Sequence, residues 1–432
     1  MRWKPYPEYK DSGVEWLGKI PADWRTKRLK YCAPLVNDKT DRAESDLPYT
    51  GLEHVESWTG KRIESGEKTE SDGQANKFRA GDVLFGKLRP YLAKVYRAKE
   101  DGICTGELLT LRPKQVVADY LFYYMLTRDF ISVVDSSTYG AKMPRAGWDF
   151  IGNLPTLLPS LNIQRAIAAF LERETARIDA LVEKKRRQIE LLQEKRSALI
   201  SHAVTKGLDP NAKMKDSGIE WLGEIPEHWQ AKRLRFLVSE PLKYGANESA
   251  ELDDPDLPRY IRITDVDENG RLREDTFKSL PEDVARPYLL KEGDLLLARS
   301  GATVGKSFYY EPCWGRAAYA GYLIRARFNP ARMMPRFVNY FTNSQQYWQW
   351  LSSSFIQATI QNVSAEKYAN LIVPVPPVDE QAEIVVYLDG MWKRLNDLTR
   401  KVGGSIEQLM NYRSALISAA VTGKIDVREE VS

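Results

Sequence analysis

Two stretches of the chain carry apolar residues at every seventh position, the spacing of a helix that packs against another helix along one seam. The first stretch lacks proline and glycine between about residues 164 and 201, so one helix there would span about 57 Å at about 1.5 Å per residue. Such a helix is too long for the surface of one small domain. The predicted seam residues are Leu171, Ile178, Leu192 and Leu199, with Lys185 between them, and Leu388, Leu395, Val402, Leu409 and Leu416. A neighbouring apolar stripe comprises Leu181, Val182, Ile189, Leu398 and Ile406.

The chain also repeats itself. KDSGVEWLGKIPADWRTKRLKY at residues 10–31 returns as KDSGIEWLGEIPEHWQAKRLRF at residues 215–236, with 14 of 22 positions identical. AGDVLFGKLRPYLAKVY at 80–96 corresponds to EGDLLLARSGATVGKSFY at 292–309, and RSALISHAVT at 196–205 returns as RSALISAAVT at 413–422. The offset between the copies grows from 205 to 212 and then to 217. Framework segments are retained while the intervening segments differ, as expected when one duplicated scaffold serves two different targets.

The two predicted helices are each other's obvious partners, because each follows an equivalent copy of the repeat. A pseudo-twofold arrangement would pair them as an antiparallel coiled coil and place one domain at each end. The alternative is that each helix packs only on its own domain, which would leave most of its length unused. Gly403 and Gly404 interrupt the second helix and cost about 1 kcal/mol each relative to alanine, so we expect a kink or a weak point there.

Each copy divides into a domain and a helix. After the shared Gly-Asp come short β-rich stretches and a helical segment, at 118–134 in the first copy and 335–353 in the second. Proline-rich exits at 154–160 and 371–380 close the domains, because proline stops both strand and helix. We therefore predict an α+β protein with two tandem α/β domains, separated and joined by the two helices. The predicted boundaries are 1–158, 159–206, 207–375, 376–424 and a tail at 425–432.

The composition narrows the class of protein. Hydrophobic residues make up 43% and charged residues 28%, typical of a globular protein, and no apolar run approaches the roughly 18 residues of a membrane span. The first residues lack the apolar stretch of a signal peptide, so we expect a cytoplasmic protein without membrane contact. Cys32, Cys104 and Cys313 are far apart and odd in number, which argues against a disulfide framework and a zinc site, and we assign no metal. A net charge of +4 means that any DNA contact requires local clusters of Lys and Arg.

No motif predicts catalysis. SGATVGKS at 300–307 resembles a phosphate-binding loop, but only three residues separate Gly301 from Gly305 and the segment continues into strand-like SFYY rather than a helix. No NPPY-like or DPPY-like tetrapeptide and no glycine-rich methyl-donor loop is present, so a self-sufficient DNA methyltransferase is not expected. The basic run Lys184–Arg187 lies on the charged side of the predicted helix and is interpreted first as a solvated face.

Together these segments resemble the specificity subunit of Type I restriction-modification systems. The resemblance rests on the two EWLGxIPxxWxxKRL openings, on PYTGLEHVESWTGK at 48–61, on the two GD stretches and on the RSALIxxAVT helix ends. It covers nearly the whole chain, in the order of recognition domain, helix, recognition domain, helix. No single motif is specific, but the doubled order is.

The resemblance implies a non-catalytic subunit that reads the two halves of a bipartite, asymmetric site in double-stranded DNA. It further implies methyltransferase subunits as partners, two of them expected, and restriction subunits reached through the complex. S-adenosylmethionine and ATP would then be bound by those partners, and no cofactor by this chain. An enzyme with an unseen site and an autonomous DNA-binding regulator remain as alternatives, which an assay of the isolated chain and a co-purification would distinguish.

Candidate DNA-binding residues are those of suitable chemistry in segments where the copies differ. Lys87 and Arg299, and likewise Lys94 and Lys306, are matched basic positions that suit phosphate contacts. At offset 217, one copy offers side chains suited to guanine or phosphate where the other offers amides suited to adenine. These residues are Lys142 and Arg145 in the first copy, and Gln357, Thr359, Gln361 and Asn362 in the second. A glycine-containing loop adds Lys243, Tyr244 and Asn247, although such amides also cap turns. The repeated Trp16, Trp24, Trp221 and Trp229 are expected to be core anchors.

Overall fold

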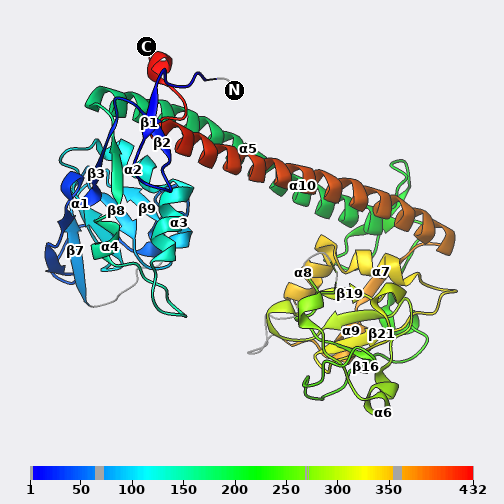
Figure 1. Ribbon diagram of the computed structural model, residues 1–432. Helices are drawn as coiled ribbons and strands as arrows, with labels where there is room; N and C mark the ends of the chain where they lie inside the picture. Colours follow the sequence, from blue (N-terminus) through cyan, green and yellow to red (C-terminus); the bar gives the residue numbers. More distant parts are fainter. Residues whose placement is uncertain (1–2, 64–72, 268–269, 271, 354–361, 432) are drawn as a thin grey trace. The chain divides into compact units, whose positions relative to one another are not determined.

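The computed structural model describes residues 3–63, 73–267, 270, 272–353 and 362–431 (Figure 1). Its contacts divide the chain into two units, one running to Arg186 and resuming at Gly403, the other running from Arg187 to Val402. Each long helix therefore contributes one part to each unit. No helix in the described part of the chain has the length and apolar character needed to cross a membrane.

Unit 1 contains two four-stranded sheets, one of which recurs in unit 2. That sheet has the order β4-β11-β8-β9, and the second sheet has the order β5-β7-β10-β6, with a parallel β6–β10 pair. Two further strand pairs, β1–β2 and β3–β12, frame the entry and exit of the domain. The strands are β1 (Tyr9–Asp11), β2 (Lys19–Pro21), β3 (Arg25–Arg28), β4 (Leu35–Val36), β5 (Lys39–Asp41), β6 (Tyr49–Thr50), β7 (Gln74–Phe78), β8 (Val83–Gly86), β9 (Val95–Arg97), β10 (Gly102–Cys104), β11 (Leu108–Leu111) and β12 (Pro155–Leu158). The helices are α1 (Leu29–Cys32), α2 (Ala118–Met125), α3 (Arg128–Ser136) and α4 (Trp148–Ile151).

Unit 2 repeats this plan strand for strand over most of its length. Its hairpin β13–β14 matches β1–β2, its pair β15–β22 matches β3–β12, and its sheet β16-β21-β18-β19 matches β4-β11-β8-β9. A parallel pair, β17–β20, stands where unit 1 has β6–β10. The strands are β13 (Met214–Asp216), β14 (Glu224–Pro226), β15 (Gln230–Arg233), β16 (Lys243–Tyr244), β17 (Arg259–Ile261), β18 (Leu295–Ala298), β19 (Ser307–Tyr309), β20 (Ala317–Tyr319), β21 (Leu323–Ala326) and β22 (Ile372–Val375). The short helices are α6 (Glu282–Ala285), α7 (Pro335–Phe341), α8 (Gln345–Ser353) and α9 (Ala365–Ala369).

The long helices are α5 (Leu161–Lys206) and α10 (Val378–Val421), both longer than the periodic patterns alone indicated (Figure 1). Equivalent glutamines dock their first turns: Gln164 accepts from Val117 N and donates to Pro159 O, and Gln381 accepts from Met334 N and donates to Pro376 O. Glycines with positive φ follow both ends, Gly207 at 77° and Gly423 at 71°, a conformation that suits a residue without Cβ.

The two helices are in antiparallel contact, as predicted. In unit 1, Arg413 of α10 donates to the Asp179 carboxylate of α5 at 2.9 Å. In unit 2, the Arg196 guanidinium of α5 lies 4.4 Å from the centre of the Trp392 ring of α10. Residue numbers rise along one helix as those of its partner fall, which gives the antiparallel direction. The α+β class with two similar domains and two long helices is thereby confirmed.

The helices also bury apolar residues against the domains. Leu171, Ile178 and Leu416 belong to the core of unit 1, and Leu388 belongs to that of unit 2. Each helix thus packs both on a domain and on the other helix. The remaining predicted seam residues are buried at Leu395 and Val402 and half-buried at Leu192, Leu199 and Leu409.

Two details of the helices differ from prediction. Leu181 and Leu398 are exposed, at 41% and 46% of their surface. Helix α10 also runs through Gly403 and Gly404 without interruption. The cost of two glycines is small beside the burial of Leu395, Val402 and Leu416 in the same helix.

The repeated tryptophans are framework residues. Trp24 and Trp229 are fully buried, and Trp16 and Trp221 pack at the edges of the same two cores. Each unit also holds a matched ion pair, between the residue before β8 or β18 and the residue after β11 or β21. Arg112 donates to both carboxylate oxygens of Asp82 at 2.9 and 2.8 Å, and Arg327 does so to Asp294 at 2.7 and 2.6 Å. The duplicated sequence therefore builds the same interior twice.

Candidate nucleic-acid interface

Three chain segments meet in the same way in both units, at the end of the matched sheet. In unit 1, an antiparallel bridge joins Leu88 to Arg145, Lys87 N donates to Glu107 O at 3.0 Å, and Ala146 N donates to Lys87 O at 3.0 Å. In unit 2, a bridge joins Ser300 to Asn362, Arg299 N donates to Tyr322 O at 3.0 Å, and Val363 N donates to Arg299 O at 2.8 Å. We call the residues at these equivalent places the frame positions. They are Lys87, Glu107 and Arg145 in unit 1, and Arg299, Tyr322 and Asn362 in unit 2.

The frame positions of unit 1 carry an ion pair. Arg145 Nε lies 3.2 Å from each Glu107 carboxylate oxygen, and Arg145 Nη2 lies 3.1 Å from Oε1. Hydrogen bonding to Glu107 raises the pKa of Arg145, so the guanidinium stays charged. Both side chains remain partly exposed, so the pair is presented at the surface rather than buried.

An exposed, partly aromatic loop surrounds this pair. Lys142 is exposed, and its carbonyl accepts a hydrogen bond from Arg89 Nη2 at 3.5 Å. Tyr139 and Met143 of the same loop are exposed as well, Tyr139 to 66%. Lysine beside unburied aromatic rings is a composition suited to a nucleic-acid surface, because the ammonium pairs with phosphate and the rings offer flat apolar faces.

The frame positions of unit 2 bring three predicted residues together. Arg299 Nε donates to the Asn362 side-chain oxygen at 3.3 Å, and its guanidinium carbon lies 4.8 Å from the centre of the Tyr244 ring. The Tyr244 hydroxyl accepts from Ala365 N at 2.9 Å, which fixes the ring. Tyr322, the third frame residue, is 63% exposed. Where unit 1 has an ion pair, unit 2 therefore has Arg299 stacked on a tyrosine, the Asn362 amide and the exposed Tyr322 ring.

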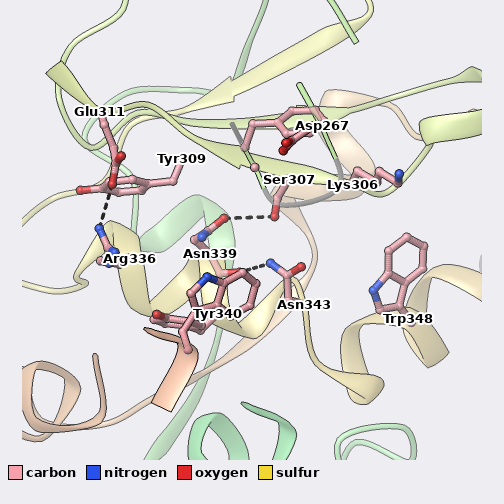
Figure 2. A pocket seen from close by; sticks show the side chains of 13 residues that line it. Asp267, Lys306, Ser307, Tyr309, Glu311, Arg336, Asn339, Tyr340, Asn343 and Trp348 are labelled. Atoms are coloured by element: carbon pink, nitrogen blue, oxygen red, sulfur yellow. Dashed lines mark hydrogen bonds and ion pairs between the residues drawn. The ribbon is translucent and has the colours of Figure 1, made fainter. Parts of the chain in front are cut away.

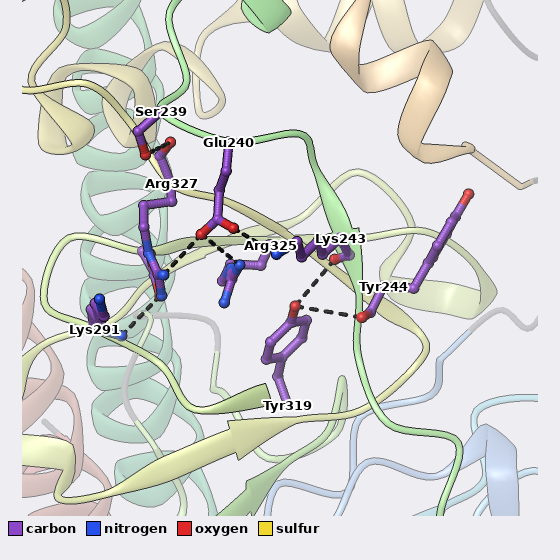
Figure 3. A network of polar contacts seen from close by, with 9 residues as sticks. Ser239, Glu240, Lys243, Tyr244, Lys291, Tyr319, Arg325 and Arg327 are labelled. Carbon is purple, nitrogen blue, oxygen red and sulfur yellow. Dashed lines mark hydrogen bonds and ion pairs between the residues drawn. The ribbon is translucent and has the colours of Figure 1, made fainter. Parts of the chain in front are cut away.

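A polar network supports the strand that carries Tyr244 (Figure 3). The Glu240 carboxylate accepts from Lys243 Nζ at 2.6 Å and from Arg325 and Arg327 at 2.8 Å each. Hydrogen bonding to Lys243 lowers the pKa of Glu240, since the charged carboxylate is the better acceptor. The Tyr319 hydroxyl donates to Lys243 O at 3.3 Å, so the backbone of the strand is held from below. Lys243 is exposed but already paired.

Asn247 lies beside this strand at a close approach of two loops. Its side-chain oxygen lies only 2.0 Å from the place where a Cβ on Gly321 would stand, so a larger residue at 321 would displace the Asn247 side chain. Asn247 and Tyr322 line one cavity of about 540 Å³ together with Arg262. The structure thus gathers Tyr244, Asn247, Tyr322 and their neighbours on one part of unit 2.

Two further predicted phosphate contacts, Lys94 and Lys306, are not among the frame positions. Lys94 Nζ donates to Leu52 O at 2.7 Å, and burial lowers its pKa. Lys306 lies at the rim of a cavity of about 490 Å³, with Ser307, Asn339 and Trp348 (Figure 2). Their roles at DNA stay predictions. The predicted residues Gln357, Thr359 and Gln361 fall outside the described residues.

Sequence reasoning missed Glu107 and Tyr322. Both directly precede matched strands, β11 and β21, at an offset of 215 between the copies. That offset falls between those of the motifs on either side, so an alignment of the two copies through these strands would have exposed the difference. Arg89, which has a φ of 50°, was also overlooked, because the motif that contains it was aligned for its lysines.

Other features add no chemistry to this surface. Among the residues described here, no three His, Cys, Asp or Glu side chains gather where a metal ion could bind. The segment 300–307 continues into strand β19, as predicted, and not into a helix that could hold a phosphate at its N-terminus. Arg186 and Arg187 of the basic run are exposed and pair with glutamates of the same helix.

Comparisons with known proteins agree with the repeated architecture. A family model described as Type I restriction modification DNA specificity domain matches residues 21–191 and again residues 243–408. The Type I restriction enzyme MjaVIII specificity subunit of Methanocaldococcus jannaschii is 23% identical over 446 residues, covering 95% of each chain. The Type I restriction enzyme StySPI specificity subunit of Salmonella potsdam is 20% identical, covering 94% of this chain and 90% of its own. A solved chain from work on complex assembly and conformational transition of the type I R-M system has a similar fold, with a TM-score of 0.70 at 18% identity, covering 93% of this chain and 98% of its own.

Proposed function

Because the chain belongs to the family of Type I restriction modification DNA specificity domains, we propose that its two domains each read one half of a bipartite, asymmetric DNA site. The observation that carries this proposal is the pair of frames. Matched backbone hydrogen bonds present Lys87 and Arg145 in one unit and Arg299 and Asn362 in the other. Base edges in the major groove differ in their donors and acceptors, so different side chains on one frame select different bases.

The chemistry of each frame suits a different base. An arginine can donate two hydrogen bonds to guanine O6 and N7, whereas an asparagine amide matches adenine N6 and N7. Around them, Lys142, Lys243 and the remaining lysines would contact phosphates, which position the protein without selecting sequence. Two such surfaces with unlike readers predict two unlike half-sites.

The chain is a non-catalytic specificity subunit, and chemistry is proposed to come from partners. In this proposal two methyltransferase subunits bind S-adenosylmethionine, and restriction subunits that use ATP join through the complex. The antiparallel helices would set the distance between the half-sites and offer a surface to the methyltransferase subunits. Adding one heptad to each helix lengthens the pair by about 10 Å, which corresponds to about three base pairs of DNA.

A reconstituted complex tests the proposal. The chain is combined with its methyltransferase subunits and S-adenosylmethionine, and methylated sites are selected from a random DNA library. We expect a two-part site with unlike halves and a fixed spacer. The isolated chain, as control, transfers no methyl groups. A single uninterrupted target, or methylation without sequence preference, would contradict the proposal.

A further inference from the structure

We propose that Glu107 determines the base preference of the first domain by making Arg145 a reader of guanine rather than of phosphate. This inference rests on the proposed function and deepens it, because it names one base and the residue that selects it. Glu107 does not itself need to touch DNA. It acts by positioning Arg145, and the observations that carry this are the geometry of the pair and its place in the frame.

The geometry leaves one edge of the guanidinium open. Glu107 accepts hydrogen bonds from Arg145 Nε and Nη2, and no hydrogen bond from Nη1 is found within the described part of the chain. A guanidinium has five N–H groups in a plane, so occupying the Nε–Nη2 side leaves one N–H on each terminal nitrogen facing outward. Those two parallel donors match guanine O6 and N7.

The carboxylate also changes which ligand the arginine prefers. An arginine with no acidic neighbour binds phosphate through its charge. Beside Glu107 the local charge is close to neutral, and a phosphate would lie near a carboxylate that repels it. A guanine edge carries no net charge and is not penalised in this way. Glu107 therefore favours the base over the backbone, and it removes rotational freedom that an unpaired arginine would lose on binding.

The second domain shows what the frame does without this carboxylate. At the place of Glu107 stands Tyr322, which has no charge, and at the place of Arg145 stands Asn362. Its arginine is instead at the first frame position, where Arg299 stacks on Tyr244 and donates to Asn362. The acidic residue and the arginine it holds are thus both replaced in unit 2.

The test uses the full chain in complex with its methyltransferase subunits and compares Glu107→Gln with Glu100→Gln. Glu100 pairs with Arg62 at 2.7 Å in the same unit and is more exposed than Glu107, so its replacement removes one paired carboxylate away from the frame. Methylated sites are selected from a random library, and binding is measured against salt concentration. Thermal unfolding of both variants establishes that each is folded.

We expect Glu107→Gln to weaken the preference for guanine at one position of one half-site by about ten-fold, the scale of a bidentate base contact. The other half-site stays unchanged, and Glu100→Gln alters neither. Arg145→Lys, which retains charge without two parallel donors, should lose the same preference and serves if Glu107→Gln unfolds. If Glu107→Gln or Arg145→Lys leaves every base preference intact while two unlike half-sites are still read, this inference is wrong and the proposed function stands. If the unaltered complex reads no bipartite site, the proposed function itself has failed.

Discussion

The two units are most alike where they are buried and least alike where they end at the surface. At the buried aspartates, Asp82–Arg112 and Asp294–Arg327 are the same bidentate pair. At the frame positions, the pair of Arg145 and Glu107 has no counterpart, because unit 2 has Asn362 and Tyr322 there. The duplicated scaffold therefore retains the ion pair with a buried aspartate in both units. It differs at the partly exposed pair, which only unit 1 has.

Removal of a buried aspartate should have the largest effect. Asp294→Ala leaves the partly buried Arg327 guanidinium with Glu240 as its remaining partner, and we expect a loss of about 3 kcal/mol in the free energy of unfolding. Asp82→Ala should cost a similar amount in unit 1. Asp397→Ala, which breaks an exposed pair with Arg400 on α10, is the control and should cost less than about 1 kcal/mol. Denaturant unfolding measures all three, and a marked difference between the two buried sites would show that the interiors are not equivalent.

Substitutions at the contacts between the helices should lower stability by a smaller amount, and by different amounts in the two units. Arg413 is 4% exposed and pairs with Asp179, whereas its counterpart Arg196 stacks on Trp392. We expect Arg413→Met to cost about 2 to 3 kcal/mol, because it leaves a nearly buried carboxylate with Lys61 as its remaining partner. Arg196→Met should cost about 1 kcal/mol, the scale of a cation–π contact. Equal costs in thermal unfolding would mean that the stacked contact is as strong as the ion pair.

A frame substitution should change recognition without changing stability. Asn362 is exposed, so Asn362→Ala is expected to alter the free energy of unfolding by less than about 0.5 kcal/mol. Its amide is proposed to read a base, and loss of such a contact relaxes discrimination at one position by about 1 to 3 kcal/mol. Methylation mapping should therefore show one degenerate position in one half-site. Uniform weakening across all sequences would instead make Asn362 a backbone contact.

The smallest expected effect is that of a single phosphate contact. Lys142→Ala should weaken binding to all sequences alike and lower the slope of log affinity against log salt by about 0.9. Lys94→Ala provides the comparison, because the Lys94 ammonium is bound to Leu52 O inside the domain. We expect Lys94→Ala to reduce stability more than it reduces the salt slope. Salt titrations of both variants decide whether Lys94 contacts phosphate as its sequence position first indicated.

The helices and the duplication could be predicted from the sequence because both leave periodic or repeated signals. Seven-residue spacing identified α5 and α10, and the identical openings identified two domains with Trp24 and Trp229 as anchors. The exposure of Leu181 could not be predicted as safely, since residues flanking a seam are buried only where a neighbouring element covers them. Continuity of α10 through Gly403 likewise depends on packing that the glycine cost alone does not reveal.

The interface was harder to predict than the fold. Arg145 and Asn362 could be chosen from their chemistry and from the difference between the copies. The partner of Arg145 could not, because Glu107 lies 38 residues before Arg145 and no periodicity links the two. Pairing across such a distance depends on how the strands that carry the residues are arranged. It can be recognised only in the structure, where β8, β11 and the loop before α4 meet.

If each domain reads its half-site independently, exchanging one domain should change one half-site alone. Residues 237–370 would be replaced by the corresponding stretch of another specificity subunit, leaving α5, α10 and the first domain intact, and the methylated sites of the reconstituted complex would be mapped. We expect one half-site to change while the other half-site keeps its sequence. A change in both half-sites, in a folded and active complex, would contradict this expectation.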